Sequence, residues 1–296
     1  MRKKNYLSFH LMLLIPTILL VIYCYVPMFG IIIAFMDYKP ALGFTGSKFT
    51  GFENFMVLFN NVNFTRALTN TIIIAFWKIV FGLVVPVIFA LLLNEVQNVA
   101  FKKTAQTIVY MPYFISWVLM SGIIIDILSP SNGAVNQILG VFGIEPIFFL
   151  GSNKWFKPII IITNIWKEFG WGTIIYMAAL TGIDMNLYEA AAIDGAGRWK
   201  QTLHITLPGI LPTIALVTML SLGNVLNAGF DQIYNLVSPI TYESGDIIDT
   251  IVYRLGMENA KFGHSTAAGL FKSVVSAFFI TISYKLAYKF TGYKVF

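Results

Sequence analysis

The sequence contains apolar runs much longer than a soluble core requires. Residues 11–36 carry no charged side chain, and no Asp, Glu, Lys or Arg occurs between Lys200 and Asp231. About 20 apolar residues are needed for a helix to cross a bilayer, and within lipid every backbone amide must find its partner inside its own segment. Only 11% of the 296 residues are charged, against about 25% in soluble proteins. The chain is therefore predicted to be an all-α polytopic membrane protein.

Six segments are long and apolar enough to be transmembrane helices. Four of them contain charges: Lys78 lies in the second, Asp126 near the end of the third, Lys167 and Glu168 at the middle of the fourth, and Lys272 in the sixth. No repeat, low-complexity tract or linker divides the sequence, so we expect a single transmembrane domain over residues 1–296. The predicted helices are residues 11–36, 71–93, 106–128, 159–180, 209–230 and 266–284.

The distribution of basic residues predicts the orientation, because Lys and Arg are favoured in cytoplasmic loops. If the N-terminus is cytoplasmic, ten basic residues lie inside and seven outside. The ten include Arg2, Lys3, Lys4 and Lys294. We therefore predict that both termini are cytoplasmic.

With this orientation the one long cytoplasmic loop is residues 184–208. It contains the run EAAAIDGAGRW, in which residues 187–193 favour a helix and Glu189 lies in the first turn. Gly195 and Gly197 then break that helix, and Pro208 marks the entry to the next span. The loop is predicted to present a helix, a sharp turn and a second helix to the cytoplasm.

The longer run EAAAIDGAGRWKQTLHITLPGILP, residues 189–212, closely resembles the EAA signature of permease subunits of bacterial ATP-binding-cassette (ABC) importers. The runs YVPMFGIIIAFMDY at 25–38 and GFENF at 51–55 look like the LplB-type branch of the carbohydrate permeases, which is related to the maltose permease subunit. This resemblance implies a six-helix type I importer permease in the bacterial plasma membrane. It also implies four partners: a second permease, two cytoplasmic ATPase subunits and an extracellular solute-binding protein.

In the family that this chain resembles, the EAA helix couples the permease to the ATPase. Carried over, Glu189 would meet a basic group of the ATPase, while Ala190 and Ala191 would face its groove. Gly195 would make the turn, with Asp194 beside it. An ordinary capped surface helix is the alternative interpretation.

Two pairs of polar residues are candidates for contacting a substrate. Lys167 and Glu168 lie at mid-helix, where a charge is costly and usually faces a cavity or a partner, and Trp171 lies close by. Aromatic faces combined with amides and charges suit a carbohydrate. Asn224 and Asn227, at i and i+3, would share one face of the fifth predicted helix, although bonding to a neighbouring helix would also explain them.

The resemblance places Asn224 and Asn227 where the maltose permease has asparagines that contact the sugar. Lys167, Glu168 and Trp171 fall on or next to its other contact positions without matching them by type, so a maltose specificity is in doubt. A lysine in the cavity would favour an acidic sugar such as a uronate oligomer. Pairing of Lys167 with Glu168, or with a residue of the partner permease, is the alternative.

Other kinds of chemistry find little support in the sequence. No nucleophile and base are paired within the predicted helices, and His264 has no neighbours at metal-ligand spacing, so neither catalytic nor metal-binding residues are expected. Gly195-Ala-Gly197 lacks the Gly-Lys-Ser/Thr that follows in a nucleotide-binding loop. We therefore expect no cofactor in this chain, with ATP bound by partner subunits.

The predicted function is that of an ABC importer permease that carries an oligosaccharide by alternating access. An acidic, polysaccharide-derived oligosaccharide is the more specific expectation. The alternative is a secondary, ion-coupled transporter that works without an ATPase and has broken helices or paired acidic groups near the midplane.

Overall fold

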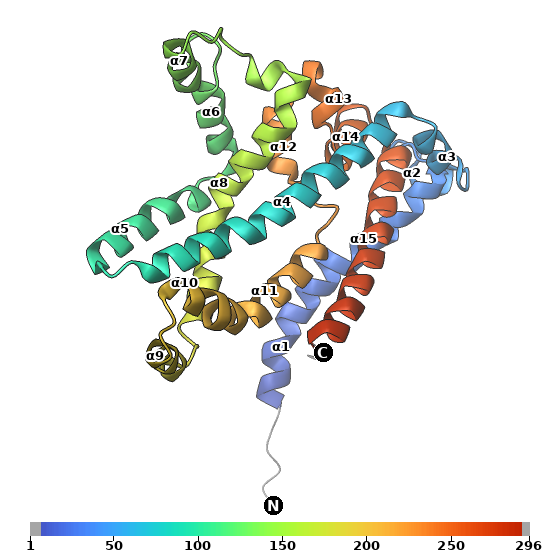
Figure 1. Cartoon of the computed structure of the whole chain (residues 1–296). Coiled ribbons are helices and arrows are strands. Elements are labelled where there is room, and N and C mark those ends of the chain that lie inside the picture. Colours follow the sequence, from blue (N-terminus) through green and yellow to red (C-terminus); the bar gives the residue numbers. More distant parts are fainter. Residues whose placement is uncertain (1–6, 292–296) are drawn as a thin grey trace, which may run out of the picture. The chain divides into compact units, whose positions relative to one another are not determined.

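The computed structural model describes residues 7–291 of the chain, and within them nearly every element is helical (Figure 1). The basic residues Arg2, Lys3, Lys4 and Lys294, on which the orientation partly depends, lie outside the described residues. The cytoplasmic location of the termini therefore stays a prediction.

Four helical stretches in the described part are long and apolar enough to cross a membrane: Phe9–Phe35, Val62–Glu95, Arg198–Leu222 and Phe262–Lys285. A fifth span results if Val99–Phe114 and Trp117–Ile127 are counted together, although they are bent by 107°. The 28-residue helix α8 (Asn153–Leu180) is also long enough. It is less apolar because Asn164, Lys167 and Glu168 interrupt it. Each of these segments overlaps one of the six predicted helices, and the number of spans stays a prediction.

The chain folds into two compact units. The first comprises residues up to Val62 together with 251–271. The second comprises residues 63–250 together with the chain from Lys272 onward. Helices α4, α14 and α15 each continue from one unit into the other.

The first unit begins with a helical run that changes its winding and ends at a small sheet. Asn54 fixes this end, because its side-chain amide donates to the carbonyls of Ala34 (2.9 Å) and Met36 (3.0 Å). Gly263 packs against the same place, since a Cβ there would lie 2.5 Å from the Met36 carbonyl oxygen. Its elements are α1 (Leu7–Leu20), the π-helix η1 (Val21–Tyr25), the 3-10 helix η2 (Val26–Phe35), β1 (Met36–Asp37), α2 (Gly43–Gly46), β2 (Lys48–Phe49, antiparallel to β1), α3 (Glu53–Phe59) and η7 (Arg254–Glu258).

The second unit is built around α8, which contacts α5, η3, α11, α12 and α13. Ile160 and Phe156 of α8 are fully buried in one apolar cluster with Ile74, Met120 and Ile233. Its other elements are α4 (Val62–Glu95), α5 (Val99–Tyr110), η3 (Met111–Phe114), α6 (Trp117–Ile127), α7 (Ala134–Val141), η4 (Phe149–Gly151), α9 (Met185–Ile193), α10 (Arg198–Gln201), η5 (Thr202–Thr206), α11 (Leu207–Leu222), α12 (Phe230–Leu236), η6 (Pro239–Thr241), α13 (Tyr242–Gly245), α14 (Ile248–Tyr253) and α15 (Phe262–Thr291).

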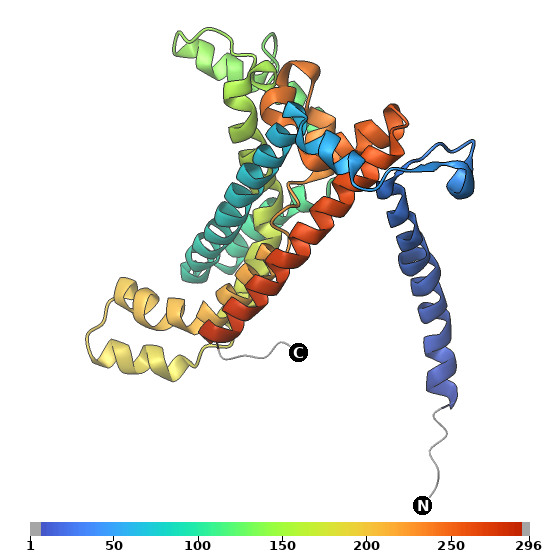
Figure 2. The same cartoon turned by 90° about the vertical axis from the view of Figure 1, so that its right-hand side faces the viewer.

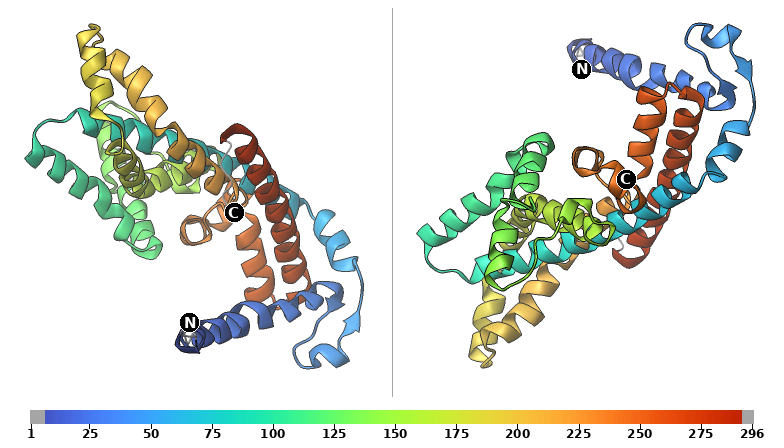
Figure 3. Two further views of the ribbon diagram at one scale, coloured as in Figure 1. Left: turned by 90° about the horizontal axis from the view of Figure 1, so that it is seen from below. Right: turned by 90° about the horizontal axis from the view of Figure 1, so that it is seen from above.

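Helix α5 reaches α8 at its C-terminal end; Figure 3 shows α5 in green and α8 in yellow-green. Gly170 makes this close approach possible. A Cβ at position 170 would collide with the carbonyl oxygen of Val109 and would lie 3.1 Å from the Cα of Tyr110. Small residues are what allow two membrane helices to bring their backbones together, so Gly170 determines where α5 ends relative to α8.

Candidate functional site

The loop that carries the EAA run forms a helical hairpin, seen in yellow and orange in Figure 2. Its first helix, α9, begins at Met185 because the carboxylate of Asp184 accepts a hydrogen bond from the Asn186 amide at 3.0 Å. The helix therefore starts two residues before the predicted 187. Glu189 consequently lies in its second turn and not in its first.

Helix α9 ends in a tight reversal. The amide of Gly195 donates to the Ala192 carbonyl (3.1 Å) and the amide of Ala196 donates to the Ala191 carbonyl (2.8 Å). Gly195 has φ = +76°, a left-handed conformation that an L side chain adopts only at a cost. Asp194 caps the helix at the residue before it. The predicted sharp turn therefore lies at Gly195, and it depends on glycine.

The hairpin presents its first helix outward. Glu189, Ala190 and Asp194 are exposed, and Ala191 is half-buried. Glu189 makes no ion pair within the described residues, so its carboxylate is available to a partner protein. Ile193, with 87% of its surface exposed, adds an apolar contact point beside the turn.

The hairpin is joined to the membrane helices by polar contacts. The Tyr188 hydroxyl lies 2.9 Å from the hydroxyl of the buried Thr206, immediately before α11. Arg198 lies 3.8 Å from Glu95 at the end of α4. The hairpin is therefore tied to the start of α11 through α9 and to the end of α4 through α10.

In the membrane part, Lys167 is buried and its ammonium is bonded within the chain. It donates to the main-chain carbonyl of Tyr113 at 2.8 Å and lies 3.9 Å from the Glu168 carboxylate. It also lies over the rings of Tyr113 and Trp117, at 5.2 and 5.3 Å from their centroids, which is a cation–π arrangement. Of the two arrangements considered from sequence, the pairing with Glu168 is therefore present.

The carbonyl that Lys167 binds lies where the bent span breaks. Residues 115–116 separate η3 from α6, and the last carbonyls of a helix have no partner in their own helix. In lipid an unpaired carbonyl would cost several kcal/mol, in the range of about 2–7. Lys167 thus satisfies the backbone at the break, a role that sequence reasoning did not assign to it.

Next to this break, Trp171 and Tyr113 form an aromatic pair. Their ring centroids are 4.8 Å apart and their planes differ by 7°. Trp171 keeps 46% of its surface exposed, and the Glu168 side chain keeps 41%. An exposed ring face and an exposed carboxylate are therefore available one helical turn apart on α8.

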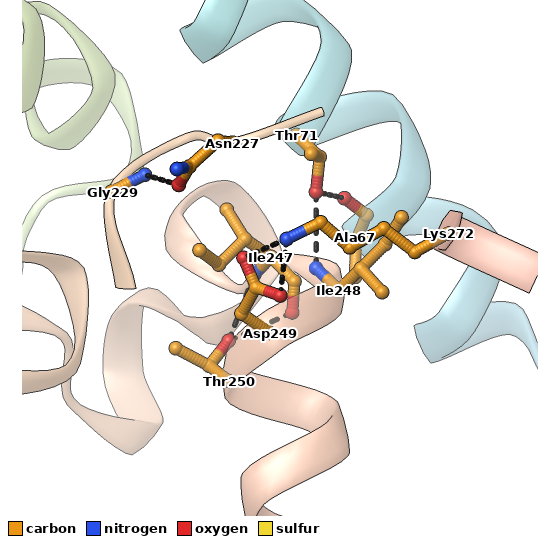
Figure 4. A network of polar contacts seen from close by, with 9 residues as sticks. All are labelled: Ala67, Thr71, Asn227, Gly229, Ile247, Ile248, Asp249, Thr250 and Lys272. Carbon is orange, nitrogen blue, oxygen red and sulfur yellow. Dashed lines mark hydrogen bonds and ion pairs between the residues drawn. The ribbon is translucent and has the colours of Figure 1, made fainter. Parts of the chain in front are cut away.

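Asn224 and Asn227 do not lie on a helix, which differs from the prediction of a helix over 209–230. Helix α11 ends at Leu222, because Gly223 and Asn224 favour helices poorly. Both asparagines are exposed in the connection from α11 to α12. The amide of Asn227 donates to the Asn224 carbonyl (2.8 Å), and the Asn227 side chain accepts from the Gly229 amide (3.3 Å), as Figure 4 shows in part.

Two further polar residues, missed as site candidates from sequence, hold this connection. Lys78 of α4 donates to the Ala228 carbonyl (2.7 Å) and to the Gln232 side-chain oxygen (2.5 Å). Gln232, fully buried, donates in turn to the Ile160 carbonyl and the Thr163 hydroxyl of α8. Lys78 could have been found from sequence, because it is a single lysine inside an apolar span. Gln232 could not, because a glutamine in a short polar stretch is not unusual.

Lys272, the remaining lysine of the predicted spans, pairs with Asp249 at 2.5 and 2.7 Å, joining α15 to α14 (Figure 4). Nearby, the Thr71 hydroxyl accepts from the Ile248 amide at 3.0 Å. None of these four residues contacts Lys167, Glu168 or Trp171 in the interactions described above. Within the described residues, no group of three His, Cys, Asp or Glu is arranged to hold a metal ion.

Known proteins with similar sequences are sugar transport permeases and related proteins. The polygalacturonan/rhamnogalacturonan transport system permease protein YteP of Bacillus subtilis is 42% identical over 281 residues, which are 95% of this chain and 88% of YteP. Protein LplB of the same organism is also 42% identical, over 94% of this chain and 88% of its own.

Solved structures agree with the sequence relatives. A crystal structure of a bacterial ABC transporter involved in the import of the acidic polysaccharide alginate matches with a TM-score of 0.91 and 40% identity, over 97% of each chain. A second crystal structure, of bacterial alginate ABC transporter in complex with alginate pentasaccharide-bound periplasmic protein, matches with the same score and identity. Residues 82–290 match the family described as binding-protein-dependent transport system inner membrane component. The chain therefore belongs to this family of membrane permease subunits, in its LplB- and YteP-like branch of sugar ABC importers.

Proposed function

We propose that this chain is the permease subunit through which an ABC importer carries an acidic oligosaccharide across the plasma membrane. As a member of a transport family it is not an enzyme. The observation that carries the choice of substrate is the cluster on α8 and its neighbours. Lys167 lies 3.9 Å from the Glu168 carboxylate and 5.2 Å from the centroid of the Tyr113 ring. That ring stacks on the exposed Trp171, so a buried lysine lies next to an exposed aromatic side chain.

Relatives support an acidic substrate. YteP is named for polygalacturonan and rhamnogalacturonan, and the transporter of the similar crystal structures imports alginate, an acidic polysaccharide. A positive site within a low-dielectric membrane attracts an anion more strongly than it would in water. Sugar rings also need flat apolar faces and a few convergent polar groups.

Each candidate residue has a specific role in this proposal. Trp171 stacks on a sugar ring, and Glu168, Asn224 and Asn227 bond to sugar hydroxyls. Lys167 acts mainly by charge and by holding the Tyr113 carbonyl, which keeps the aromatic pair in place.

Transport requires partners that this chain lacks. We propose that a second, similar permease completes the path, that an extracellular binding protein delivers the sugar, and that two cytoplasmic ATPases bind ATP, so that this chain needs no cofactor of its own. The crystal structure with a sugar-bound periplasmic protein supports such a delivery. The ATPase would dock on α9 through Glu189, Ala190 and Ala191, with Asp194 and Gly195 shaping the turn.

Energy would pass through the hairpin. ATP binding draws the ATPases together and moves the hairpin of α9 and α10. The contact of Tyr188 with Thr206 passes that motion to α11, and the contact of Arg198 with Glu95 passes it to α4. The permease pair then alternates between outward-open and inward-open states. A switch of this kind works only if the ATP-bound ATPases contact the two states with different free energies.

The test is transport in proteoliposomes that contain this chain, its partner permease and the ATPases, with the binding protein added outside. Labelled trigalacturonate is expected to enter only with ATP and binding protein, and unlabelled maltotriose is not expected to compete. Uptake by the permeases alone would refute ABC coupling and favour the ion-coupled alternative. ATP-dependent uptake of maltotriose in preference to trigalacturonate would keep the coupling and refute the acidic substrate.

A further inference from the structure

The connection between α11 and α12 carries both candidate asparagines but little regular structure of its own. Leu226 and Ala228 are buried in it, whereas Asn224 and Asn227 are exposed. Part of its backbone is paired within the connection, as in the bond from the Asn227 amide to the Asn224 carbonyl. The remaining polar groups need partners elsewhere, because helix ends leave carbonyls unpaired. The position of the asparagines is therefore set by whatever binds this stretch of backbone.

Lys78 is the side chain that binds it. Its ammonium donates to the Ala228 carbonyl at 2.7 Å, one residue after Asn227. A second bond, of 2.5 Å, goes to the Gln232 side-chain oxygen. A lysine in a membrane helix needs such partners, and the carbonyl needs a donor, so the two requirements are met in one contact.

Gln232 gives the ammonium a fixed point of attachment. The Gln232 amide nitrogen donates to the Ile160 carbonyl (2.8 Å) and the Thr163 hydroxyl (2.9 Å), both on α8. Lys78 therefore joins three parts of the second unit: α4, which carries it, the connection, and α12 with its attachment to α8.

Gly229 makes room for this contact. Its backbone has φ = +91°, and a Cβ there would lie 2.9 Å from the Lys78 Nζ atom. A residue with a side chain would be strained and would push the ammonium away. The left-handed glycine and the lysine thus fit each other at the same point of the connection.

We propose that Lys78 is a positioning residue: by bonding Ala228 and Gln232 it holds Asn224 and Asn227 where the transported sugar meets them. This proposal rests on the proposed function for the role of the asparagines. One consequence can be tested without a substrate: the connection is expected to move when Lys78 loses its hydrogen bonds.

The first experiment measures this placement directly. The single cysteine, Cys24, is replaced by serine, and Asn227→Cys is introduced as a reporter in the complete complex in liposomes. Its rate of reaction with a water-soluble maleimide is compared between Lys78, Lys78→Met and Lys78→Arg. Trp171→Cys, exposed on α8 and not bonded to Lys78, is the matched reporter.

Lys78→Met is expected to change the labelling rate at position 227 by about tenfold, the effect of losing a charge-assisted hydrogen bond, and to leave position 171 unaffected. Lys78→Arg, which keeps a donor, is expected to restore the rate. An unchanged rate at 227, or an equal change at both reporters, would overturn the proposal. Gln232→Met removes the other acceptor and gives the same comparison if Lys78→Met does not assemble.

The second experiment measures uptake with the native asparagines in place. Lys78→Met is expected to raise KM for trigalacturonate by about tenfold while kcat changes little, because misplaced binding groups lose uniform binding. The double variant Lys272→Met with Asp249→Asn also removes a membrane lysine and is expected to keep the wild-type KM. A fall in kcat alone would overturn the proposal. Failure of the wild-type complex to take up the sugar would refute the proposed function and leave the labelling result standing.

Discussion

The indole ring of Trp171 lies parallel to the phenol ring of Tyr113, with centroids 4.8 Å apart and planes 7° from parallel. The two rings come from opposite sides of a junction: Trp171 belongs to α8, and Tyr113 belongs to the end of η3, where the bent span breaks. Lys167 donates to the Tyr113 carbonyl from the same helix as Trp171. The aromatic surface proposed to meet a sugar and the bond that holds the break are therefore parts of one contact between α8 and η3.

The first prediction concerns the stacked ring. Trp171→Ala is expected to raise KM for oligosaccharide uptake by up to about tenfold, because an aromatic contact contributes about 0.5–1.5 kcal/mol beyond buried area. Trp171→Phe should recover most of the loss. Trp166→Ala removes another exposed tryptophan of α8 and serves as the control, with KM unchanged. Equal effects of Trp166→Ala and Trp171→Ala would argue against a sugar contact at 171.

The second prediction concerns the turn after α9. Gly195→Ala is expected to reduce ATP-driven uptake and to uncouple the ATPase, since a left-handed alanine costs about 1–2 kcal/mol. No atom lies within 4 Å of the missing Cβ, so strain and not collision would cause the loss. Asn tolerates this backbone conformation, and Gly195→Asn should keep more activity than Gly195→Ala.

Gly197 supplies the matched control for the turn. Its φ of −68° suits any residue, and its surroundings are equally open. Gly197→Ala is expected to transport normally. Comparable losses in Gly195→Ala and Gly197→Ala, measured as uptake and as ATPase stimulation by loaded binding protein, would contradict the role of the left-handed turn.

The third prediction separates the two adjacent charges of α8. Lys167→Met leaves the Tyr113 carbonyl without its donor, and the expected cost to stability is about 1–3 kcal/mol. Glu168→Gln removes no bond to the backbone and is expected to change substrate preference more than stability. Thermal unfolding of the purified complex, followed with competition between trigalacturonate and maltotriose, measures both. A more stable complex with Lys167→Met would show that the ammonium is not needed at the break.

The fourth prediction concerns Lys272 and Asp249, whose side chains are only 22% and 21% exposed. Removing one partner of such a pair leaves a poorly solvated charge and costs about 3–5 kcal/mol. Lys272→Met alone is therefore expected to lower the amount of assembled complex sharply. Adding Asp249→Asn should restore it. Independent, additive effects of the two changes in a thermal unfolding cycle would mean that the pair does not act as a unit.

Much of the fold could be predicted because lipid imposes simple demands. The apolar runs located the membrane helices, and the glycine at position 195 marked its turn, since each signal is local in sequence. Lys167 and Glu168 were recognised as unusual because a bilayer excludes charges. None of these inferences required knowing which helix neighbours which.

The remaining features depend on contacts between distant segments. The bend between η3 and α6 depends on a lysine 54 residues away from Tyr113, and Lys78 finds its partner 150 residues away. Asn224 and Asn227 were assigned to a helix because their spacing fits a helix, whereas α11 ends at Leu222. Periodicity describes a helix once it exists, but it does not show where the helix stops, and α11 stops before Gly223 and Asn224, which favour helices poorly.

At Gly170, the space between α8 and the end of α5 is too small for one methyl group. With hydrogen as its side chain, α8 rests directly on the main chain of Val109 and Tyr110, three residues from the lysine that reaches Tyr113. A single added carbon would push α5 and η3 outward and lengthen the Lys167 bond and the ring spacing together. The distance between α8 and α5 is thus set by backbone contact, and so is the geometry of the proposed sugar contact, which flexible side chains cannot readjust.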